Sequence, residues 1–241
     1  MPYDKITTDA GRTREVELRQ CAIRNRSAGE AGEEWHRPSP EEIERVNRCN
    51  ALRRLRQIIN ANFGPDDIWV TFTYRKGLRP TTDEALSHYP KLARDVRKLY
   101  ADAGTPLPYV AVTEERPWKK PHHHMVLPGI KLSKLQALWP YGHVNARPLD
   151  GSGQYRKLAE YIFSHTDIPE RAGNRWKCSK GLERPQPKKK SIKAKHWREG
   201  IKIPKGWMLD PQTEPEQGRN PYSGAEYLRY TLIRLEIKRR C

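Results

Sequence analysis

The sequence contains no run of 18 or more apolar residues, so we expect no membrane-spanning helix. Residues 1–26 lack the apolar core of a secretory signal peptide. Four cysteines are present, but they are far apart and form no Cys-x-x-Cys pair, which argues against a zinc knuckle or a disulfide framework. A Gly-x-x-x-x-Gly-Lys-Ser/Thr phosphate loop is also absent. We therefore expect a cytoplasmic protein with free thiols and no ATP-driven motor.

Acidic residues are few relative to basic ones. The 46 Lys and Arg outnumber the 29 Asp and Glu and give a net charge of +17. Such an excess favours binding to a polyanion, because neutralised phosphates release condensed counterions. Charge alone does not separate DNA from RNA or from an acidic membrane surface. The apolar content of 36% and the mean hydropathy of -0.94 predict one modest core with long polar segments.

The order of apolar patterns predicts an α+β fold. A helix is expected from Ser39 to about Asn62, because Ser39 and Glu42 form a capping box. β-Branched and aromatic residues predict strands, and apolar residues at helical spacing predict helices. The strands are expected at 67–74, 109–114, 120–127 and 143–149, and the helices at 82–103, 132–139 and 151–165. This order is that of a ferredoxin-like split βαβ antiparallel sheet with helices on one face.

Composition divides the chain into three parts. Residues 1–38 are polar without a clear period, so we expect a flexible arm. Residues 39–170 hold the apolar patterns and form the expected domain. Residues 171–241 form a basic, Pro-containing C-terminal extension, since 171–205 contain 13 Lys and Arg but only two acids. Trp197 and Trp207 lie in the basic part, which is either a solvated tail or a surface for phosphate contacts and base stacking.

Three consecutive histidines, His122, His123 and His124, lie in the third expected strand. Residues two apart in a strand point to the same face, so His122 and His124 can converge on one metal ion while His123 points away. Glu114, near the end of the preceding strand, is the expected third ligand, with Glu115 as the alternative. Mixed imidazole and carboxylate ligation suits a divalent cation. A strand histidine is otherwise most often a satisfied polar residue.

Tyr161 lies in the last helix of the expected domain, on the flank of its apolar face. It shares a stripe with Lys157 and His165 at four-residue spacing. A phenol with a cation one turn away can present its oxygen to a phosphate as a nucleophile. Tyr155 points inward and is expected to be structural. The alternative for Tyr161 is an ordinary residue at an apolar boundary.

Together, three segments resemble the three motifs of the HUH endonucleases, and most closely the rolling-circle replication initiators of plasmids and single-stranded DNA phages. Trp69–Tyr74 (WVTFTY) resembles the first motif, a Thr-rich apolar strand. Lys120–Leu127 (KPHHHMVL) resembles the second, the metal-binding strand. Leu158–Ser164 (LAEYIFS) resembles the third, the tyrosine helix. In that family a Lys usually stands where this chain has Ser164, and we expect Lys157 or His165 to supply the missing cation.

The resemblance implies a metal-dependent single-strand DNA endonuclease and strand transferase. His122, His124 and Glu114 would hold Mg²⁺ or Mn²⁺, and Tyr161 would form a 5′-phosphotyrosine link. The partner would be single-stranded DNA at a replication origin, with a host polymerase and helicase acting afterwards in a bacterial host. We expect further DNA contacts from Thr71, Thr73, Arg75, Lys119, Lys120, Arg184, Lys188, Lys189 and Lys190.

Other functions remain open on the sequence alone. A transposase or a conjugative relaxase of the same superfamily would use the same motifs, although relaxases usually have a third histidine in place of the carboxylate. The chain could also be a non-catalytic nucleic-acid-binding module whose histidines are structural. That protein would bind DNA with a steep salt dependence and form no covalent adduct.

Overall fold

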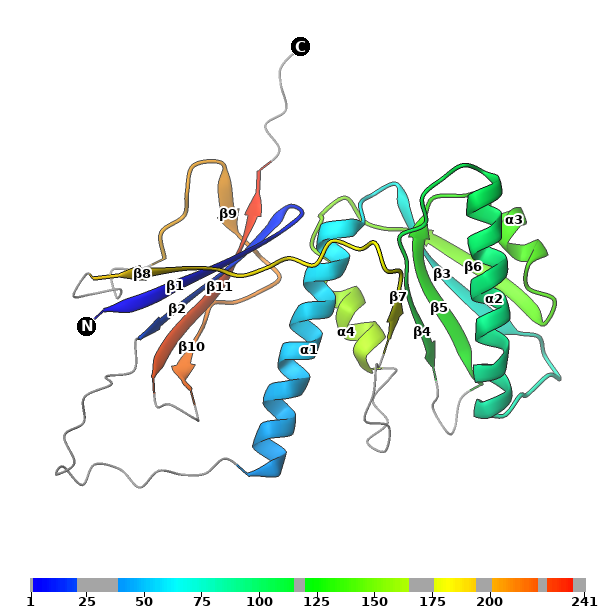
Figure 1. The fold of residues 1–241 in the computed structure, drawn as a ribbon, viewed down its shortest axis with the longest axis horizontal. Coiled ribbons are helices and arrows are strands. Elements are labelled where there is room, and N and C mark those ends of the chain that lie inside the picture. Colours follow the sequence, from blue (N-terminus) through cyan, green and yellow to red (C-terminus); the bar gives the residue numbers. More distant parts are fainter. Residues whose placement is uncertain are drawn as a thin grey trace, which may run out of the picture. The chain divides into compact units, whose positions relative to one another are not determined.

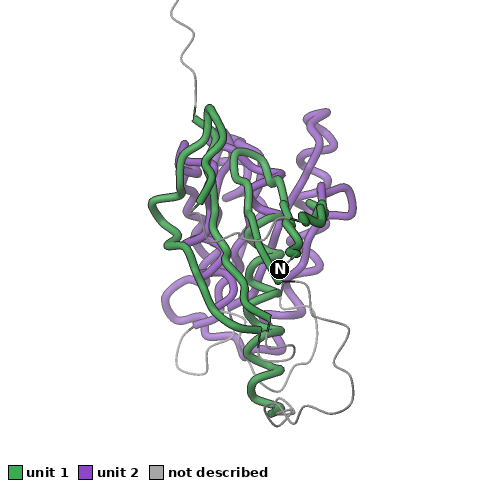
Figure 2. The backbone as a smooth tube through the Cα atoms, turned by 90° about the vertical axis from the view of Figure 1, so that its left-hand side faces the viewer, with its two compact units in different colours: residues 1–57, 184–241 green, residues 58–183 purple. Residues whose placement is uncertain are grey.

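The computed structural model describes residues 2–20, 39–114, 120–164, 176–193, 201–220 and 225–235. The chain divides into two compact units, which are coloured separately in Figure 2. Unit 1 contains residues 1–57 and 184–241, and unit 2 contains residues 58–183. Helix α1 (Pro40–Asn62) begins in unit 1 and ends in unit 2. None of the described helices is long and apolar enough to cross a membrane.

Unit 2 is built on a five-stranded sheet with the order β6-β3-β5-β4-β7 (Figure 1). All neighbouring strands are antiparallel. The strands are β3 (Asp67–Tyr74), β4 (Val110–Glu114), β5 (His122–Pro128), β6 (Gly142–Pro148) and β7 (Lys177–Cys178). Because β5 lies between β3 and β4, which are joined by a helix, the sheet has the split βαβ arrangement. The predicted α+β class is confirmed.

One face of this sheet carries the main apolar core. Val70, Phe72 and Tyr74 alternate along β3 and are all buried on this face. Helices α2 (Thr82–Asp102) and α3 (Leu132–Ala137) pack on it (Figure 1). The hydroxyl of Thr81 accepts a hydrogen bond from the backbone N–H of Glu84, and the Glu84 carboxylate accepts one from the N–H of Thr81, so a capping box starts α2.

Helix α4 (Arg156–Ser164) lies against the opposite face, so the helices do not all share one face as the sequence had suggested. Asn60, in the last turn of α1, holds the start of this helix. Its Oδ1 accepts a hydrogen bond from the backbone N–H of Tyr155 at 2.9 Å, and its Nδ2 donates to Gln154 Oε1 at 3.1 Å. Asn60 and Gln154 are both buried, so these bonds satisfy groups that water cannot reach.

Unit 1 contains a second antiparallel sheet, with the order β10-β11-β2-β1-β8 and β9 paired with β11 (Figure 1). Its strands are β1 (Tyr3–Ala10), β2 (Thr13–Gln20), β8 (Lys188–Ile192), β9 (Trp207–Leu209), β10 (Glu216–Arg219) and β11 (Glu226–Arg234). Its core is small, with Val16, Leu18, Tyr230 and Leu232 buried. Arg56 of α1 donates to Glu15 of β2 at 2.6 Å.

The sheet of unit 1 differs from the arm and the extension expected from composition. Residues 3–20, expected in a flexible arm, form a hairpin, and the basic C-terminal part supplies the four strands β8 to β11. The physical reason is that this sheet is stabilised largely by polar pairs across its strands. An example is Arg229 of β11 with Glu17 of β2 at 2.9 Å, which leaves no clear alternation of apolar residues in the sequence.

The two hydrogen bonds of the Asn60 side chain, to the Tyr155 N–H and to Gln154, lead to a stability prediction. Asn60→Ala leaves the Tyr155 N–H and the Gln154 side chain without these partners inside the protein, so we expect a loss of about 2 to 3 kcal/mol in the free energy of unfolding. Urea denaturation followed by circular dichroism measures it. Asn145→Ala is the control, because Asn145 is exposed, and it should change the free energy by less than about 0.5 kcal/mol. Equal losses of stability for the two substitutions would show that the hydrogen bonds of Asn60 do not stabilise the protein.

Candidate active site

Pairing on both sides of β5 determines where its three histidines point. His122 lies opposite Thr73 of β3 and Glu114 of β4. His124 lies opposite Thr71 of β3. Because directly opposed residues in an antiparallel sheet share a face, these side chains occupy the face that α4 covers. The expected two-and-one division of the three histidines is therefore observed.

Glu114 lies between the two imidazoles. Its Oε2 is 3.6 Å from His124 Nε2 and 3.8 Å from His122 Nδ1, and the centroids of the two rings are 6.1 Å apart. The carboxylate and His124 are buried, with 4% and 3% of their surfaces exposed. A carboxylate at this depth needs charge compensation, which a cation or protonated imidazoles can supply.

His122, His124 and Glu114 are of donor types that can hold a divalent cation. Two imidazoles and one carboxylate suit a cation that keeps coordination positions open. The Glu114 Oε2 separations of 3.6 Å from His124 Nε2 and 3.8 Å from His122 Nδ1 place oxygen and nitrogen donors near one another. The three side chains do not yet surround one common point. Among the described residues, no group of three or more His, Cys, Asp or Glu side chains is arranged to hold a metal ion.

Neighbours on β3 fix the orientation of His124. Thr71 Oγ1 is hydrogen-bonded to His124 Nδ1 at 3.0 Å, so the ring directs Nε2 towards Glu114. Trp69 stacks on the same imidazole, with ring centroids 4.9 Å apart and planes 7° from parallel. A hydrogen bond to the non-ligating nitrogen is the usual way in which proteins orient a histidine ligand. Trp69 was not among the site residues predicted from the sequence. Its position two residues before Thr71 could have indicated it, because residues two apart in a strand point to the same face.

Tyr161 reaches the same face from α4. Its ring meets His124 edge-on at 5.5 Å between centroids and meets Trp69 edge-on at 5.8 Å. Ala159, Ile162 and Phe163 are the buried residues of the helix, so Tyr161 lies on its flank and remains 41% exposed. The Tyr161 ring therefore contacts the protein on one side and is exposed on the other.

Two described residues bear on the positive charge expected beside Tyr161, namely Lys157 and Ser164. Lys157 is exposed, one turn before Tyr161 on α4. Ser164, where the resemblance leads one to expect Lys, donates from Oγ to the backbone carbonyl of Tyr161 at 2.9 Å. It therefore binds the helix backbone rather than presenting a charge. His165, Glu115 and Lys119 lie outside the described residues.

The expected DNA-binding residues fall into two groups. Thr71 and Thr73 lie on the site face, next to the histidines. Arg75 is exposed just after β3, and Lys120 Nζ donates to its backbone carbonyl at 3.4 Å. Arg184 and the lysines of β8 belong to unit 1. The set of DNA-binding residues predicted from the sequence therefore contains residues from both units.

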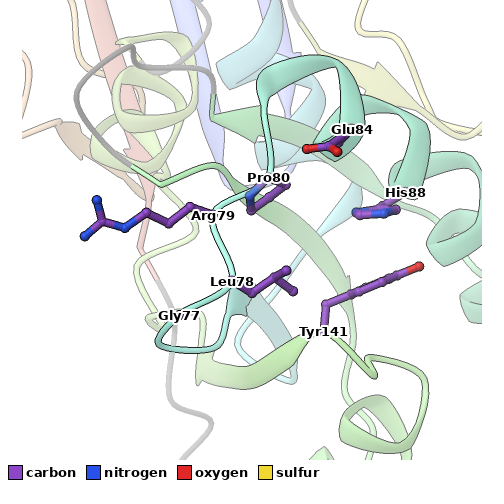
Figure 3. A pocket seen from close by; sticks show the side chains of 7 residues that line it. All are labelled: Gly77, Leu78, Arg79, Pro80, Glu84, His88 and Tyr141. Atoms are coloured by element: carbon purple, nitrogen blue, oxygen red, sulfur yellow. The ribbon is translucent and has the colours of Figure 1, made fainter.

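A pocket of about 530 Å³ lies away from this cluster (Figure 3). It is lined by the loop from Gly77 to Pro80, by Glu84 and His88 of α2, and by Tyr141. His88 and Tyr141 stack with centroids 4.1 Å apart. The hydroxyl of Tyr74, a residue of the apolar core, is hydrogen-bonded to His88, so the pocket belongs to the face of the sheet opposite Glu114. It plays no part in the site.

His123 is held on the apolar face by two hydrogen bonds. Its Nδ1 bonds Thr113 Oγ1 at 2.9 Å and its Nε2 bonds the Tyr74 hydroxyl at 3.1 Å. Burial, followed by the charges of His88, His124, His122 and Lys177, lowers its pKa from 6.5 to about 3. His123 is therefore neutral near pH 7 and occupies a fully buried position.

Comparison with known protein families gives a match in unit 2. Residues 67–166 match the family model described as replication-associated protein ORF2/G2P. No curated protein and no solved structure matches. The matched segment contains β3, β5 and α4, and with them every residue of the cluster at Glu114. The match supports a role in DNA replication.

The neutral state of His123 leads to a pH prediction. The unfolded chain takes up a proton near pH 6.5, whereas the folded protein does so only near pH 3, so acid favours the unfolded state in this range. Wild-type protein should lose about 2 kcal/mol more stability than His123→Phe between pH 7 and pH 5. Urea titrations in EDTA measure the difference. Parallel pH curves for the two proteins would show that His123 does not cause it.

Proposed function

We propose that this protein nicks and rejoins single-stranded DNA at a replication origin, using Tyr161 as the nucleophile. The observation that carries the proposal is the convergence of Glu114, His122 and His124 with the Tyr161 ring on one sheet face. The match to replication-associated proteins over residues 67–166 supports it from an independent direction. The biological role would be initiation of rolling-circle replication of a plasmid or phage in the bacterial cytoplasm.

His122, His124 and Glu114 are the proposed ligands of Mg²⁺ or Mn²⁺. When bound, such an ion acts as a Lewis acid on the scissile phosphate. The protein residues supply the rest of the site. Thr71 and Trp69 orient His124, and the buried Glu114 offers a negative charge that attracts a cation. Small rotations of the two imidazoles would bring their nitrogens to bonding distance.

The proposed step exchanges one phosphate ester for another. The oxygen of Tyr161 attacks the phosphorus, and the bond from phosphorus to the 3′ oxygen breaks. Tyr161 is left carrying the 5′ phosphate, the phenol proton passes to solvent, and the departing 3′ oxygen gains a proton. Lys157, one turn away, would favour the phenolate. Because ester bonds are exchanged, no ATP is required, and a host polymerase with a helicase can extend the free 3′-OH.

A denaturing gel tests the nucleophile. Wild-type protein incubated with Mn²⁺ and single-stranded origin oligonucleotides should form a covalent protein–DNA adduct. Tyr161→Phe should reduce the adduct about a thousandfold or more, because the attacking oxygen is removed. Tyr155→Phe is a matched control, since it removes a hydroxyl that donates to the carbonyl of Asp150 at 3.1 Å and keeps the buried ring. It should keep the adduct.

Metal dependence is read in the same assay. EDTA, or the double substitution His122→Ala/His124→Ala, should abolish the adduct. An adduct that survives in either case would overturn the ligand assignment, and survival in Tyr161→Phe would overturn the nucleophile. If wild-type protein binds several origin sequences but never forms an adduct, the chain is a non-catalytic binding module.

Lys157 has a separate test. Lys157→Ala should slow adduct formation about tenfold, because a cation near the developing phenolate is lost. Lys134→Ala is the control, since Lys134 is exposed on α3, which packs on the opposite face of the sheet. Single-turnover rates at pH 7 and pH 9 should differ more for Lys157→Ala than for wild-type protein. Wild-type rates in Lys157→Ala would remove this residue from the mechanism.

A further inference from the structure

Three consecutive lysines, Lys188 to Lys190, lie on β8 at the edge of the unit 1 sheet, and their side chains alternate between its two faces. Lys189 lies on one face, where its Nζ is 2.8 Å from the buried carboxylate of Asp4. Lys188 and Lys190 point to the other face, and both are exposed. The Lys189 side chain is 57% exposed, but its ammonium is paired with Asp4, whereas Lys188 and Lys190 have no carboxylate within ion-pair distance among the described residues.

A third lysine joins them. Lys5 of β1 is the direct partner of Lys190 across the strands. Like charges in directly opposed positions destabilise a sheet. Lysines on an edge strand also discourage pairing with other chains, and that role explains why β8 is basic. It does not explain a lysine opposite Lys190 on the inner strand. We call Lys5, Lys188 and Lys190 the lysine face.

The lysine face has little compensating negative charge. Between residues 184 and 193 there are five Lys and Arg and no acid. In the described part of the chain, none of its three lysines makes an ion pair with a carboxylate. Asp9, which lies on that face, is paired with Arg14 at 2.5 Å and also interacts electrostatically with Lys188. Lys188 and Lys190 are exposed and Lys5 is half-buried, so the face carries more positive than negative charge and can attract an external anion.

The aromatic rings of unit 1 indicate which polyanion fits. The Arg14 and Arg234 guanidinium groups lie 4.4 and 5.1 Å from the centre of the Trp207 ring. Arg229 covers Tyr227 at 4.3 Å, and Tyr230 is buried. Tyr3, the remaining ring in the described part of unit 1, packs against the core. Binding of single strands relies on open rings for base stacking, and these rings are already engaged.

We propose that the lysine face binds the phosphate backbone of duplex DNA without regard to sequence. Lysines that contact phosphates position a protein on DNA rather than read its sequence, and the rings in the described part of unit 1 are already engaged. The duplex would be the double-stranded DNA flanking the nicked strand. This inference rests on the proposed function only for its partner, DNA, and not for the chemistry at Tyr161.

The test measures the salt dependence of binding to a 20-base-pair duplex of arbitrary sequence by fluorescence anisotropy. For the full-length Lys5→Gln/Lys188→Gln/Lys190→Gln protein, the slope of log affinity against log salt should become shallower by about 2 to 3. Each lost phosphate contact contributes about 0.9 to this slope. Affinity at 0.1 M salt should fall about 10- to 100-fold. The pair Lys188→Gln/Lys190→Gln, with both changes on the exposed edge strand, should give about two thirds of the change in slope.

Two control variants distinguish loss of the lysine face from a general loss of positive charge and from damage to the sheet. Lys91→Gln/Lys98→Gln/Lys134→Gln removes three exposed lysines from helices of unit 2 and should leave the slope near the wild-type value. Lys189→Gln, in the same run of lysines, breaks the pair with Asp4 and should lower the melting temperature, so it shows how much of any binding loss comes from damage to the sheet.

Each outcome decides the proposal. A slope unchanged in the Lys5/Lys188/Lys190 variant, or one changed equally by the unit 2 control, would overturn it. An equal loss for a single-stranded oligonucleotide would overturn the choice of duplex DNA. Formation of the Tyr161 adduct on a short single strand should be normal in this variant. Failure of that adduct in wild-type protein would reject the nicking function while leaving the duplex measurement valid.

Discussion

The antiparallel pairing of β5 with β3 on one side and β4 on the other is the constraint on which the site depends. Because successive strand residues point to opposite faces, this pairing sends His122 and His124 towards Glu114 and sends His123 into the apolar core. A slip of one residue would exchange the two faces and turn His122 and His124 into the apolar core. The bonds from His123 to Thr113 and Tyr74 oppose that slip, so the spacer histidine helps to hold the register.

The two units carry different kinds of interaction. In unit 2 a buried carboxylate, two imidazoles and a half-exposed phenol meet on one sheet face, and this is the arrangement to which the proposed nicking is assigned. In unit 1 a small apolar core is supplemented by ion pairs across strands, such as Arg229 with Glu17, and the lysine face carries more positive than negative charge. We infer that unit 2 acts on the single strand and that unit 1 holds the neighbouring duplex.

The sequence predicted much of unit 2 and little of unit 1. The strands and helices of unit 2 follow strong local signals, namely β-branched runs and apolar residues at helical spacing, and the Ser39–Glu42 capping box is present at the start of α1. The partnership of β1 with β8 joins segments more than 180 residues apart, and its polar pairs leave no local period. The covering of Trp207 by arginines depends on such distant contacts. It was therefore not visible in the sequence.

The central claim is that the phenol beside His124 becomes joined to DNA. Peptide mapping by mass spectrometry, after the DNA of a reacted sample is digested with nuclease, tests it most directly. Trypsin cleavage after Arg156, Lys157 and Arg171 separates Tyr155 from the peptide 158–171, whose sole tyrosine is Tyr161. The account predicts a nucleotide mass on peptide 158–171 that appears with Mn²⁺ and is lost with EDTA. A nucleotide on any other peptide, or unmodified protein after reaction with its origin DNA, would contradict it.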